Sequence, residues 1–500
     1  MAFSESTKQG AEVSELPKGL VRWLTYGVLL LAISLAIGQW AFNRSLWLDE
    51  AKLALNIMDK GFLELLQPLD REQAASVGFL WLEKLVTLLF GVSEPALRLL
   101  PLLSYLLCIP LVFSVGRKLL RNERLGLLAS IAFALASSSL YYATEVKQYG
   151  FETMVGLALV WAYLKDFRTL KRRLWALSIA GCLAVLCSMT SWILLTVIGL
   201  HLFIKKCIQE KQWAYLMPMV FWTVTALSYY LLALNNHPNQ AKLQEYWANY
   251  FMPSNPFSTE FFEFIHYSLK EELFGFVTGF GKLSFGWLFL SIAGAVALLR
   301  KNIRLLAMLS IGSFTLHLIL SSLHLYPFAD RLVLYLSPFF LMLCIKGIHI
   351  ITQRFNQRNT LTGLMQLALV VSLLYPVLKR YPREREEIKP AIAILNQSVL
   401  EHEVVYLYSY SKPALEYYER LGEVDFAGNI VELSRDLAFE RELITTRSEC
   451  WFLGSHVQKQ NGRSENEIVL DYFQEQGFRI LEQNQFSGAF LYRLDKEMAP

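Results

Sequence analysis

Acidic and basic residues stand next to hydrophobic stretches at three places in this sequence. Asp49 and Glu50 lie in "RSLWLDEAKLALNI" (44–57), directly after a hydrophobic run. Glu145 and Lys147 lie in "YYATEVKQYGFE" (141–152), after a later run, and Arg331 lies at the start of "RLVLYLSPFF". A carboxylate can take a proton from a hydroxyl, and Lys and Arg stabilise anions that form during a reaction. These residue types therefore fit a group transfer that uses one base and two cations.

Each of these residues also has a purely structural explanation. Asp is a common N-cap and Glu suits the first helical turn, so Asp49 and Glu50 could simply start a surface helix. Lys147 is also typical of a membrane interface, and Arg331 or Arg98 could anchor helix ends. The functional interpretation depends on position, because these charges are all predicted to lie at the outer ends of their membrane spans. Charges kept at a membrane boundary inside a helix bundle are candidates for function.

The elements that position these residues are predicted to be membrane helices. Hydrophobic residues make up 54% of the 500 residues, well above a soluble globular chain. A helix needs roughly 20 apolar residues to cross a bilayer. The sequence predicts eleven spans, several of them short: 24–42, 95–116, 125–143, 150–164, 174–188, 190–204, 213–234, 284–299, 305–323, 332–351 and 361–378.

The distribution of Lys and Arg predicts the orientation of the spans. Cytoplasmic loops collect basic residues, and the segments 117–124 and 165–173 hold four and five of them. This pattern places residues 1–22 in the cytoplasm. It places the loops 43–94 and 235–283 and the tail outside the cell membrane. The charged motifs then all lie at the outer ends of their spans.

The outer loop 43–94 is predicted to contain two helices that lie on the membrane surface. Apolar residues at 48, 51, 55, 58, 62 and 65 recur every three or four positions, which is typical of an amphipathic helix. We expect this first helix over 43–66. The second, over 76–91, has an apolar face with Glu83 and Lys84 opposite. The connection 67–75 is expected to border the site.

The composition changes abruptly at "KRYPREREEIKP" (379–390), and a polar tail follows. Three strand-like runs, 403–410, 450–456 and 488–494, alternate with helix-like segments at 412–422 and 465–477. Such an alternation predicts a small α/β domain. The chain is thus divided into a membrane domain, 23–380, and an extracytoplasmic soluble α/β domain, 381–500.

The order of the motifs resembles a known superfamily. "WLDEAKLALNI" is followed by "LDREQAASVGFLWLEKLVTLLFGVSEPALRLLPLL", then by "YYATEVKQYGFETM" and "DRLVLYLSPFFLML". This succession resembles the GT-C superfamily, in particular the bacterial glycosyltransferases that use polyprenyl-phosphate sugars. They are related to protein O-mannosyltransferases and to the aminoarabinose transferase of lipid A. The resemblance covers roughly residues 20–380 and implies a polytopic α-helical membrane protein.

The resemblance also implies roles for individual residues. The acid of the first outer loop, Asp49, would be the catalytic base, with Glu50 beside it, and Glu145 would complete the site. Basic residues would bind the lipid phosphate. The expected substrate-binding set, including residues of the connection 67–75, is Lys147, Tyr149, Arg331, Arg98, Asp70 and Gln73.

The same resemblance implies the partners. The donor would be a polyprenyl-phosphate-linked sugar, and the acceptor an extracytoplasmic hydroxyl on a glycan, lipid or protein, with the enzyme in the plasma (inner) membrane. One essential base favours inversion at the anomeric carbon. The formal charge of +4 is spread over many loops and favours no nucleic-acid partner. No metal-binding spacing is present among the histidines. A divalent cation between Asp49 and Glu145 stays an open alternative.

Two other classes of function remain as alternatives. A lipid or solute transporter or flippase would also be polytopic, but such folds often have related halves and helices broken near the membrane centre. The sequence has neither feature, and its charges gather at one end. A non-catalytic scaffold that displays the tail domain would not explain the charged motifs.

Overall fold

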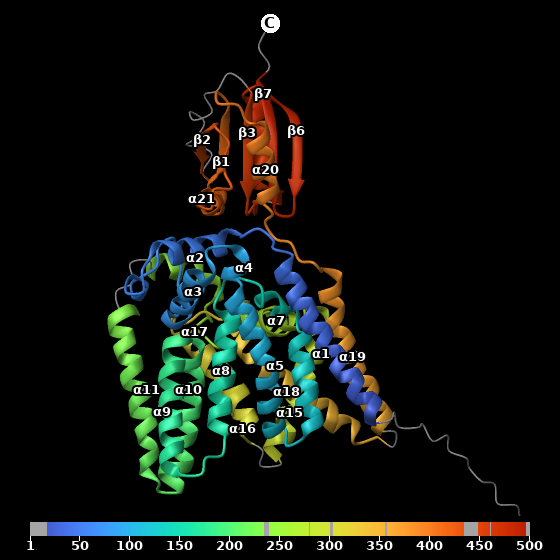
Figure 1. Cartoon of the computed structure of the whole chain (residues 1–500). Helices are drawn as coiled ribbons and strands as arrows, with labels where there is room; N and C mark the ends of the chain where they lie inside the picture. The colour runs from blue at the N-terminus through green and yellow to red at the C-terminus, as the bar shows by residue number, and fades with distance from the viewer. Residues whose placement is uncertain are drawn as a thin grey trace, which may run out of the picture.

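Helices stand at all eleven predicted hydrophobic runs in the computed structural model of the chain (Figure 1). The structure describes residues 18–234, 240–279, 281–300, 304–355, 358–434, 449–460 and 462–496. Most of the predicted N-terminal segment 1–22 lies outside these residues. The eleven helices are α1 (Lys18–Ala41), α5 (Leu99–Leu119), α6 (Glu123–Leu135), α8 (Tyr149–Leu164), α9 (Leu170–Cys187), α10 (Thr190–Leu202), α11 (Leu216–Tyr229), α15 (Ser284–Arg300), α17 (Ser313–Ser322), α18 (Ser337–Thr352) and α19 (Arg358–Lys379).

Seven helical segments of the described chain are long and apolar enough to cross a membrane. They are Glu94–Leu119, Thr190–Gln209, Trp213–Ala233, Gly281–Leu299, Leu305–Ser322, Asp330–Thr352 and Asn359–Lys379. Two further apolar helices, Thr25–Ala41 and Tyr149–Leu164, are shorter. The multi-span helical architecture is therefore confirmed, and the count of eleven spans stays a prediction.

The third predicted run does not form one helix. Helix α6 ends at Leu135, and α7 (Ser137–Tyr142) begins a new direction after Ala136, whose backbone is extended. Ser side chains compete for backbone hydrogen bonds and favour helix ends, and three serines follow at 137–139. The short helix α14 (Phe276–Thr278) packs on α7 and ends at Gly279, which has a φ of +72°. A β-carbon there would approach Ser137 Cβ to 2.9 Å.

The loop 43–94 contains two short helices and leads into a third. α2 (Leu48–Asp59) is shorter than the predicted 43–66, because the chain turns at Lys60 and continues into a 3₁₀ turn at Glu64–Leu66. α3 (Val77–Phe90) has 14 residues, about 21 Å of helix, too little to cross a bilayer of about 30 Å. α4 (Glu94–Leu97) leads into α5. The loop 235–283 contains α12 (Gln240–Tyr246), α13 (Thr259–Tyr267) and a π-helical segment at Ser268–Gly275.

The predicted orientation of α3 is only partly correct. Its apolar residues divide between two sides: Phe79 and Leu80 are buried, whereas Leu85 and Leu89 are exposed. Glu83, expected on an outward polar face, is fully buried. The reason is that the inner side of α3 packs against α4 and α9, so this face lies inside the protein.

The tail forms the predicted α/β domain. Its main sheet has the order β2-β1-β3-β7-β6, parallel from β2 to β3 and antiparallel from β3 to β6. The strands are β1 (Val404–Tyr408), β2 (Asn429–Leu433), β3 (Cys450–Ser455), β6 (Phe478–Phe486) and β7 (Ala489–Lys496). A two-residue pair, β4 (Lys459–Gln460) and β5 (Arg463–Ser464), stands apart. The helices are α20 (Lys389–Ser398), α21 (Lys412–Arg420) and α22 (Glu465–Glu475).

The sheet domain stands on the end of the bundle that carries α2 and α4 (Figure 1). Leu55 of α2 belongs to one buried apolar cluster with Ile388 and Leu415 of the tail. The hydroxyl of Tyr418 accepts a hydrogen bond from the Leu46 N–H at 2.8 Å. Apolar burial and satisfied buried polar groups together favour a fixed contact. The loop 43–94 and the tail domain thus lie at the same end of the molecule.

Candidate active site

Asp49 lies at the start of α2 and is held between two cations. The N-cap of α2 is Trp47, so Asp49 does not have the N-cap role that was its structural alternative. One of its carboxylate oxygens lies 3.8 Å from Lys147 Nζ and 3.4 Å from an Arg331 nitrogen. Its side chain is 19% exposed, whereas that of its neighbour Glu50 is 0% exposed. Asp49 is therefore the acid of this pair that a substrate could reach.

The two cations keep Asp49 ionised. Burial raises the pKa of the Asp49 carboxyl, but the charges of Lys147 and Arg331 outweigh it and hold the pKa below its ordinary value. Burial lowers the pKa of Lys147, and the Asp49 carboxylate partly opposes that change. At neutral pH the group that could accept a proton is thus in its basic form.

Two more predicted residues contact the cations. Lys147 Nζ donates a hydrogen bond to Gln73 Oε1 at 2.6 Å. Arg331 lies over the ring of Tyr149, 5.9 Å from its centre, and over Trp247 at 5.0 Å. Cation–π contacts fix a guanidinium without using its hydrogen-bond donors. The structure therefore brings Asp49, Lys147, Arg331, Tyr149 and Gln73 together.

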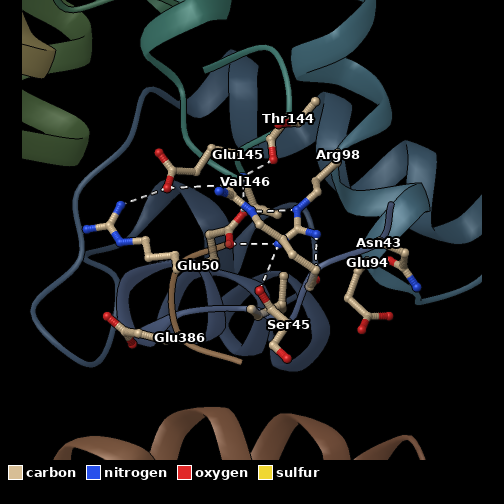
Figure 2. Close-up of polar contacts among 12 residues, drawn as sticks. Asn43, Ser45, Glu50, Glu94, Arg98, Thr144, Glu145, Val146 and Glu386 are labelled. Carbon is tan, nitrogen blue, oxygen red and sulfur yellow. Dashed lines mark hydrogen bonds and ion pairs between the residues drawn. The ribbon is translucent and has the colours of Figure 1, made fainter. Parts of the chain in front are cut away.

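Glu50 and Arg98 form a second, buried cluster beside the first (Figure 2). Arg98 donates two hydrogen bonds to the Glu50 carboxylate, at 3.1 and 2.8 Å, and a third to the Arg44 carbonyl oxygen at 2.7 Å. Glu50 also accepts a hydrogen bond from the Val146 N–H at 2.8 Å. Burial raises the pKa of Glu50, and Arg98 and Arg44 lower it by more. This pair joins α2 to the segment that carries Lys147, which suits a positioning role.

Glu145 is buried against cations from two other segments. Its Oε1 accepts a hydrogen bond from Arg385 at 3.0 Å and another from the Tyr141 hydroxyl, and lies 3.6 Å from Arg44. Its Oε2 has no hydrogen-bond partner among the described residues. Glu145 therefore attaches the linker after α19 to the membrane domain.

Asp70 lies apart from these clusters. Its side chain is 64% exposed and forms an ion pair with Lys60 at 3.0 Å. Its backbone N–H donates to Asn56 of α2. The contacts of Asp70 therefore stabilise the 67–75 connection and do not include Asp49.

A polar cavity of about 590 Å³ adjoins the Asp49 cluster. Arg331 lines it, together with three arginines after α19: Arg380, Arg383 and Arg385. Glu272 and Asp330 line it as well. Burial first, and then the Asp330 carboxylate, raise the pKa of Glu272 to about 7. Glu272, Arg44 and the three linker arginines were not predicted from the sequence as site residues. The segment "KRYPREREEIKP" (379–390), which contains the three arginines, was noted only as a change of composition.

The described residues contain no group of three or more His, Cys, Asp or Glu side chains that could hold a metal ion. Asp49 and Glu145 each contact cationic side chains, as given above. A divalent cation stays an untested alternative.

The chain is similar to known proteins in part of its sequence and in its overall fold. Residues 75–234 match the family model described as dolichyl-phosphate-mannose-protein mannosyltransferase. No curated protein matches the chain in sequence. The solved structure of ArnT from Cupriavidus metallidurans bound to undecaprenyl phosphate has a TM-score of 0.57 and 12% identity, and covers 95% of this chain and 98% of that one. The apo state of ArnT gives a TM-score of 0.54 at 12% identity, with the same coverage.

The chain thus shares the fold of ArnT over nearly its whole length, and residues 75–234 also match the mannosyltransferase family model. A solved structure of the arabinofuranosyltransferase AftD from Mycobacteria is more remote, with a TM-score of 0.47 at 12% identity over 96% of this chain and 40% of that one. The family match and the fold shared with ArnT confirm the resemblance that the motifs indicated. They also confirm a multi-pass helical architecture with a small C-terminal sheet domain. The segments after α1, before α8 and before α18 bring the site together. The roles of its residues stay predictions.

Proposed function

We propose that this protein is a membrane glycosyltransferase that moves a sugar from a polyprenyl phosphate to an acceptor hydroxyl. The observation that carries the proposal is the ionised, partly exposed Asp49, held between Lys147 and Arg331 beside a polar cavity at the end of a membrane bundle. The fold shared with ArnT, solved with undecaprenyl phosphate bound, supports a lipid-phosphate donor. The match to a dolichyl-phosphate-mannose family model supports the same class.

The proposed reaction is a single displacement. Asp49 takes the proton of the acceptor hydroxyl while that oxygen bonds to the anomeric carbon of the sugar. The bond between the anomeric carbon and the phosphate oxygen breaks, and its electron pair leaves with the polyprenyl phosphate. Arg331 and Lys147 stabilise the charge that develops on this phosphate. Attack opposite the leaving group inverts the anomeric centre.

The buried acids would act indirectly in this scheme. Glu50 and Arg98 hold the start of α2 against residue 146, so they fix the separation of Asp49 and Lys147. Glu145 completes the site by holding Arg385 at the wall of the cavity. We propose that this site and the tail domain face away from the cytoplasm.

The direct test compares cell-envelope glycans with and without the protein by mass spectrometry. We expect one envelope component to lose one sugar residue when the protein is absent, and the corresponding polyprenyl-phosphate sugar to accumulate. Restoring the wild-type gene product should reverse both changes. An unchanged glycan profile, with unchanged polyprenyl-phosphate sugars, would reject a glycosyltransferase and favour a transporter or scaffold.

A further inference from the structure

The turn that precedes Asp49 is held by the linker between α19 and the tail domain. The N–H of Leu48, the first residue of α2, donates a hydrogen bond to Glu386 Oε2 at 3.1 Å. The N-cap residue, Trp47, makes no capping hydrogen bond with its own side chain. The first N–H groups of a helix have no partner within it, so the Glu386 carboxylate takes the place of a capping side chain. Glu386 thereby fixes the backbone one residue before Asp49.

A histidine of the tail domain holds this carboxylate. His456 directly follows β3, and its Nδ1 lies 2.8 Å from Glu386 Oε1. A carboxylate only accepts hydrogen bonds, so Nδ1 carries the hydrogen. The His456 ring also stacks on the Trp47 ring, with 6.1 Å between the centres and 23° between the planes. His456 therefore contacts both the N-cap of α2 and the carboxylate that caps this helix.

The backbone of His456 has an uncommon conformation. Its φ is +57°, in the left-handed region that L-residues seldom adopt and that His, Asn and Asp enter most often. Its N–H donates to the carbonyl oxygen of Gly488, in the turn between β6 and β7, at 3.3 Å. Such conformations persist where the surrounding structure holds them, and they gather at functional sites. The tail domain thus holds His456 at its contact with the linker.

The turn between β6 and β7 also holds the linker itself. The Glu387 N–H donates to the Ser487 carbonyl oxygen at 2.8 Å. A β-carbon at Gly488 would clash with the carbonyl oxygen of Arg385, so the turn lies directly on the backbone of this arginine. The Arg385 guanidinium lies 3.2 Å from the centre of the Trp47 ring and lines the polar cavity. The tail domain therefore contacts two linker residues that reach the site.

We infer that the tail domain positions the proposed base, with His456 acting through Glu386 as a positioning residue for Asp49. His456 holds Glu386, and Glu386 holds the first N–H of α2. The direction of this first turn sets where the Asp49 carboxylate lies relative to its two cations. The inference rests on the proposed function for the role of Asp49, and it gives the tail domain a part in the reaction.

A small displacement of Asp49 is enough to slow the reaction. A general base must come within about 2.6–3.2 Å of the hydroxyl whose proton it takes. Misplacing a reacting group by about 1 Å can cost roughly a hundredfold in rate. The next residue, Glu50, is anchored separately by Arg98 and the Val146 N–H. Loss of the Glu386 cap should therefore shift the first turn of α2 without unfolding the helix.

The first test compares two substitutions of equal size in the full-length protein in lipid nanodiscs. Asn and Asp both tolerate a positive φ. The Asn amide can donate to Glu386 as Nδ1 does, whereas Asp can only accept and repels a carboxylate. We expect His456→Asp to lower kcat roughly ten- to a hundredfold, with an unchanged KM for the polyprenyl-phosphate sugar that accumulates in cells lacking the protein. His456→Asn should keep most of the wild-type kcat.

His402→Asp, at an exposed position of the same domain, is the control and should transfer as the wild type does. A wild-type kcat in His456→Asp would overturn the inference. Equal losses in His456→Asn and His456→Asp would also overturn it, because only one of these variants keeps the donor.

A second measurement needs no transfer reaction. Hydrogen exchange of the segment 46–50, followed by mass spectrometry, reports on the Leu48 N–H. We expect this segment to exchange faster in His456→Asp than in the wild type, and at the wild-type rate in His456→Asn. Unchanged exchange in His456→Asp would reject the link between His456 and α2. Faster exchange in a protein that shows no transfer would reject the proposed function and leave this link standing.

Gly488→Ala tests the contact with Arg385. Gly477→Ala is the matched control, because its φ of +83° is strained for alanine as the +66° of Gly488 is. A β-carbon at Gly477 meets no described atom within 4 Å. We expect Gly488→Ala to lower kcat roughly tenfold more than Gly477→Ala does. Equal effects of the two substitutions on kcat would show that the tail domain acts only through its own stability, which contradicts the inference.

Discussion

Asp49 and Glu50 are adjacent in the sequence and have different surroundings. Successive residues of an α-helix point about 100° apart, so the two carboxylates of α2 face different groups. Asp49 reaches Lys147 and Arg331 with part of its side chain exposed, whereas Glu50 is enclosed with Arg98. The sequence placed both acids at the site. The sequence alone does not show which acid is accessible, because that depends on where Arg98, between α4 and α5, lies in the fold.

The Glu50–Arg98 pair should be important for stability. Arg98→Met removes the nearest counter-ion of the buried Glu50 carboxylate and leaves only Arg44, at 4.0 Å. Breaking a buried ion pair in this way typically costs about 3–5 kcal/mol. We expect a large loss of thermal stability in detergent. Adding Glu50→Gln should restore much of it, because the buried charge is then removed as well. Additive losses in the double variant, measured as a thermodynamic cycle, would show that the two side chains are not energetically coupled.

At the scale of the elements, α3 contains a fully buried acid, Glu83. Both carboxylate oxygens of Glu83 lack a hydrogen-bond partner among the described residues. Burial raises the pKa of Glu83 well above its ordinary value. Between its unfolded pKa of about 4.3 and this raised folded pKa, the native state binds more protons than the unfolded state. Glu83 therefore contributes stability that is present at acid pH and is lost as the pH rises.

Glu83→Gln should remove this pH dependence. We expect the variant to be more thermostable than the wild type at pH 8 and closer to it at pH 5, measured as the thermal midpoint in detergent across that range. Glu419→Gln, at an exposed position in α21, serves as the control and should follow the wild-type curve. Parallel curves for Glu83→Gln and the wild type would mean that Glu83 is ionised in the folded protein.

Elements with a strong apolar signal could be predicted from the sequence, and weaker ones could not. The long hydrophobic runs gave all eleven helix positions, and the apolar strands β1, β3 and β7 were predicted for the same reason. Strands β2 and β6 were missed because most of their residues are exposed or half-buried, so they carry no apolar run. The break before α7 was missed because Ala and Ser continue the apolar stretch. Arg385 was missed because its partner, Glu145, lies 240 positions away.

At the scale of the whole molecule, the loop 43–94 and the tail domain lie at one end of the bundle (Figure 1). Lys389 of α20 forms an ion pair with Glu94 of α4 at 2.7 Å, and Ser45 donates to Glu387 at 3.0 Å. The linker between α19 and the tail thus contributes both to the docking of the domain and to the wall of the cavity. This arrangement explains why residues from both parts of the chain meet at the site.

Reporter fusions should show on which side of the membrane this end lies. A fusion after Glu210 should report the cytoplasm, because the loop before it is rich in Lys. A fusion after Tyr381 should report the opposite side, which requires an odd number of spans. A cytoplasmic signal after Tyr381 would place the tail domain and the Asp49 site in the cytoplasm and contradict the proposed orientation.

The most direct test of the proposed reaction is the transfer rate of Asp49→Asn in membranes supplied with the polyprenyl-phosphate sugar that accumulates in cells lacking the protein. Asn has nearly the same size as Asp and cannot accept the proton, and Trp47 remains the N-cap of α2. We expect a loss of roughly 10²- to 10⁴-fold in rate, with unchanged yield and unchanged binding of polyprenyl phosphate. Asp59→Asn, at the other end of α2, should keep the wild-type rate. Wild-type transfer by Asp49→Asn would contradict the assignment of Asp49 as the catalytic base.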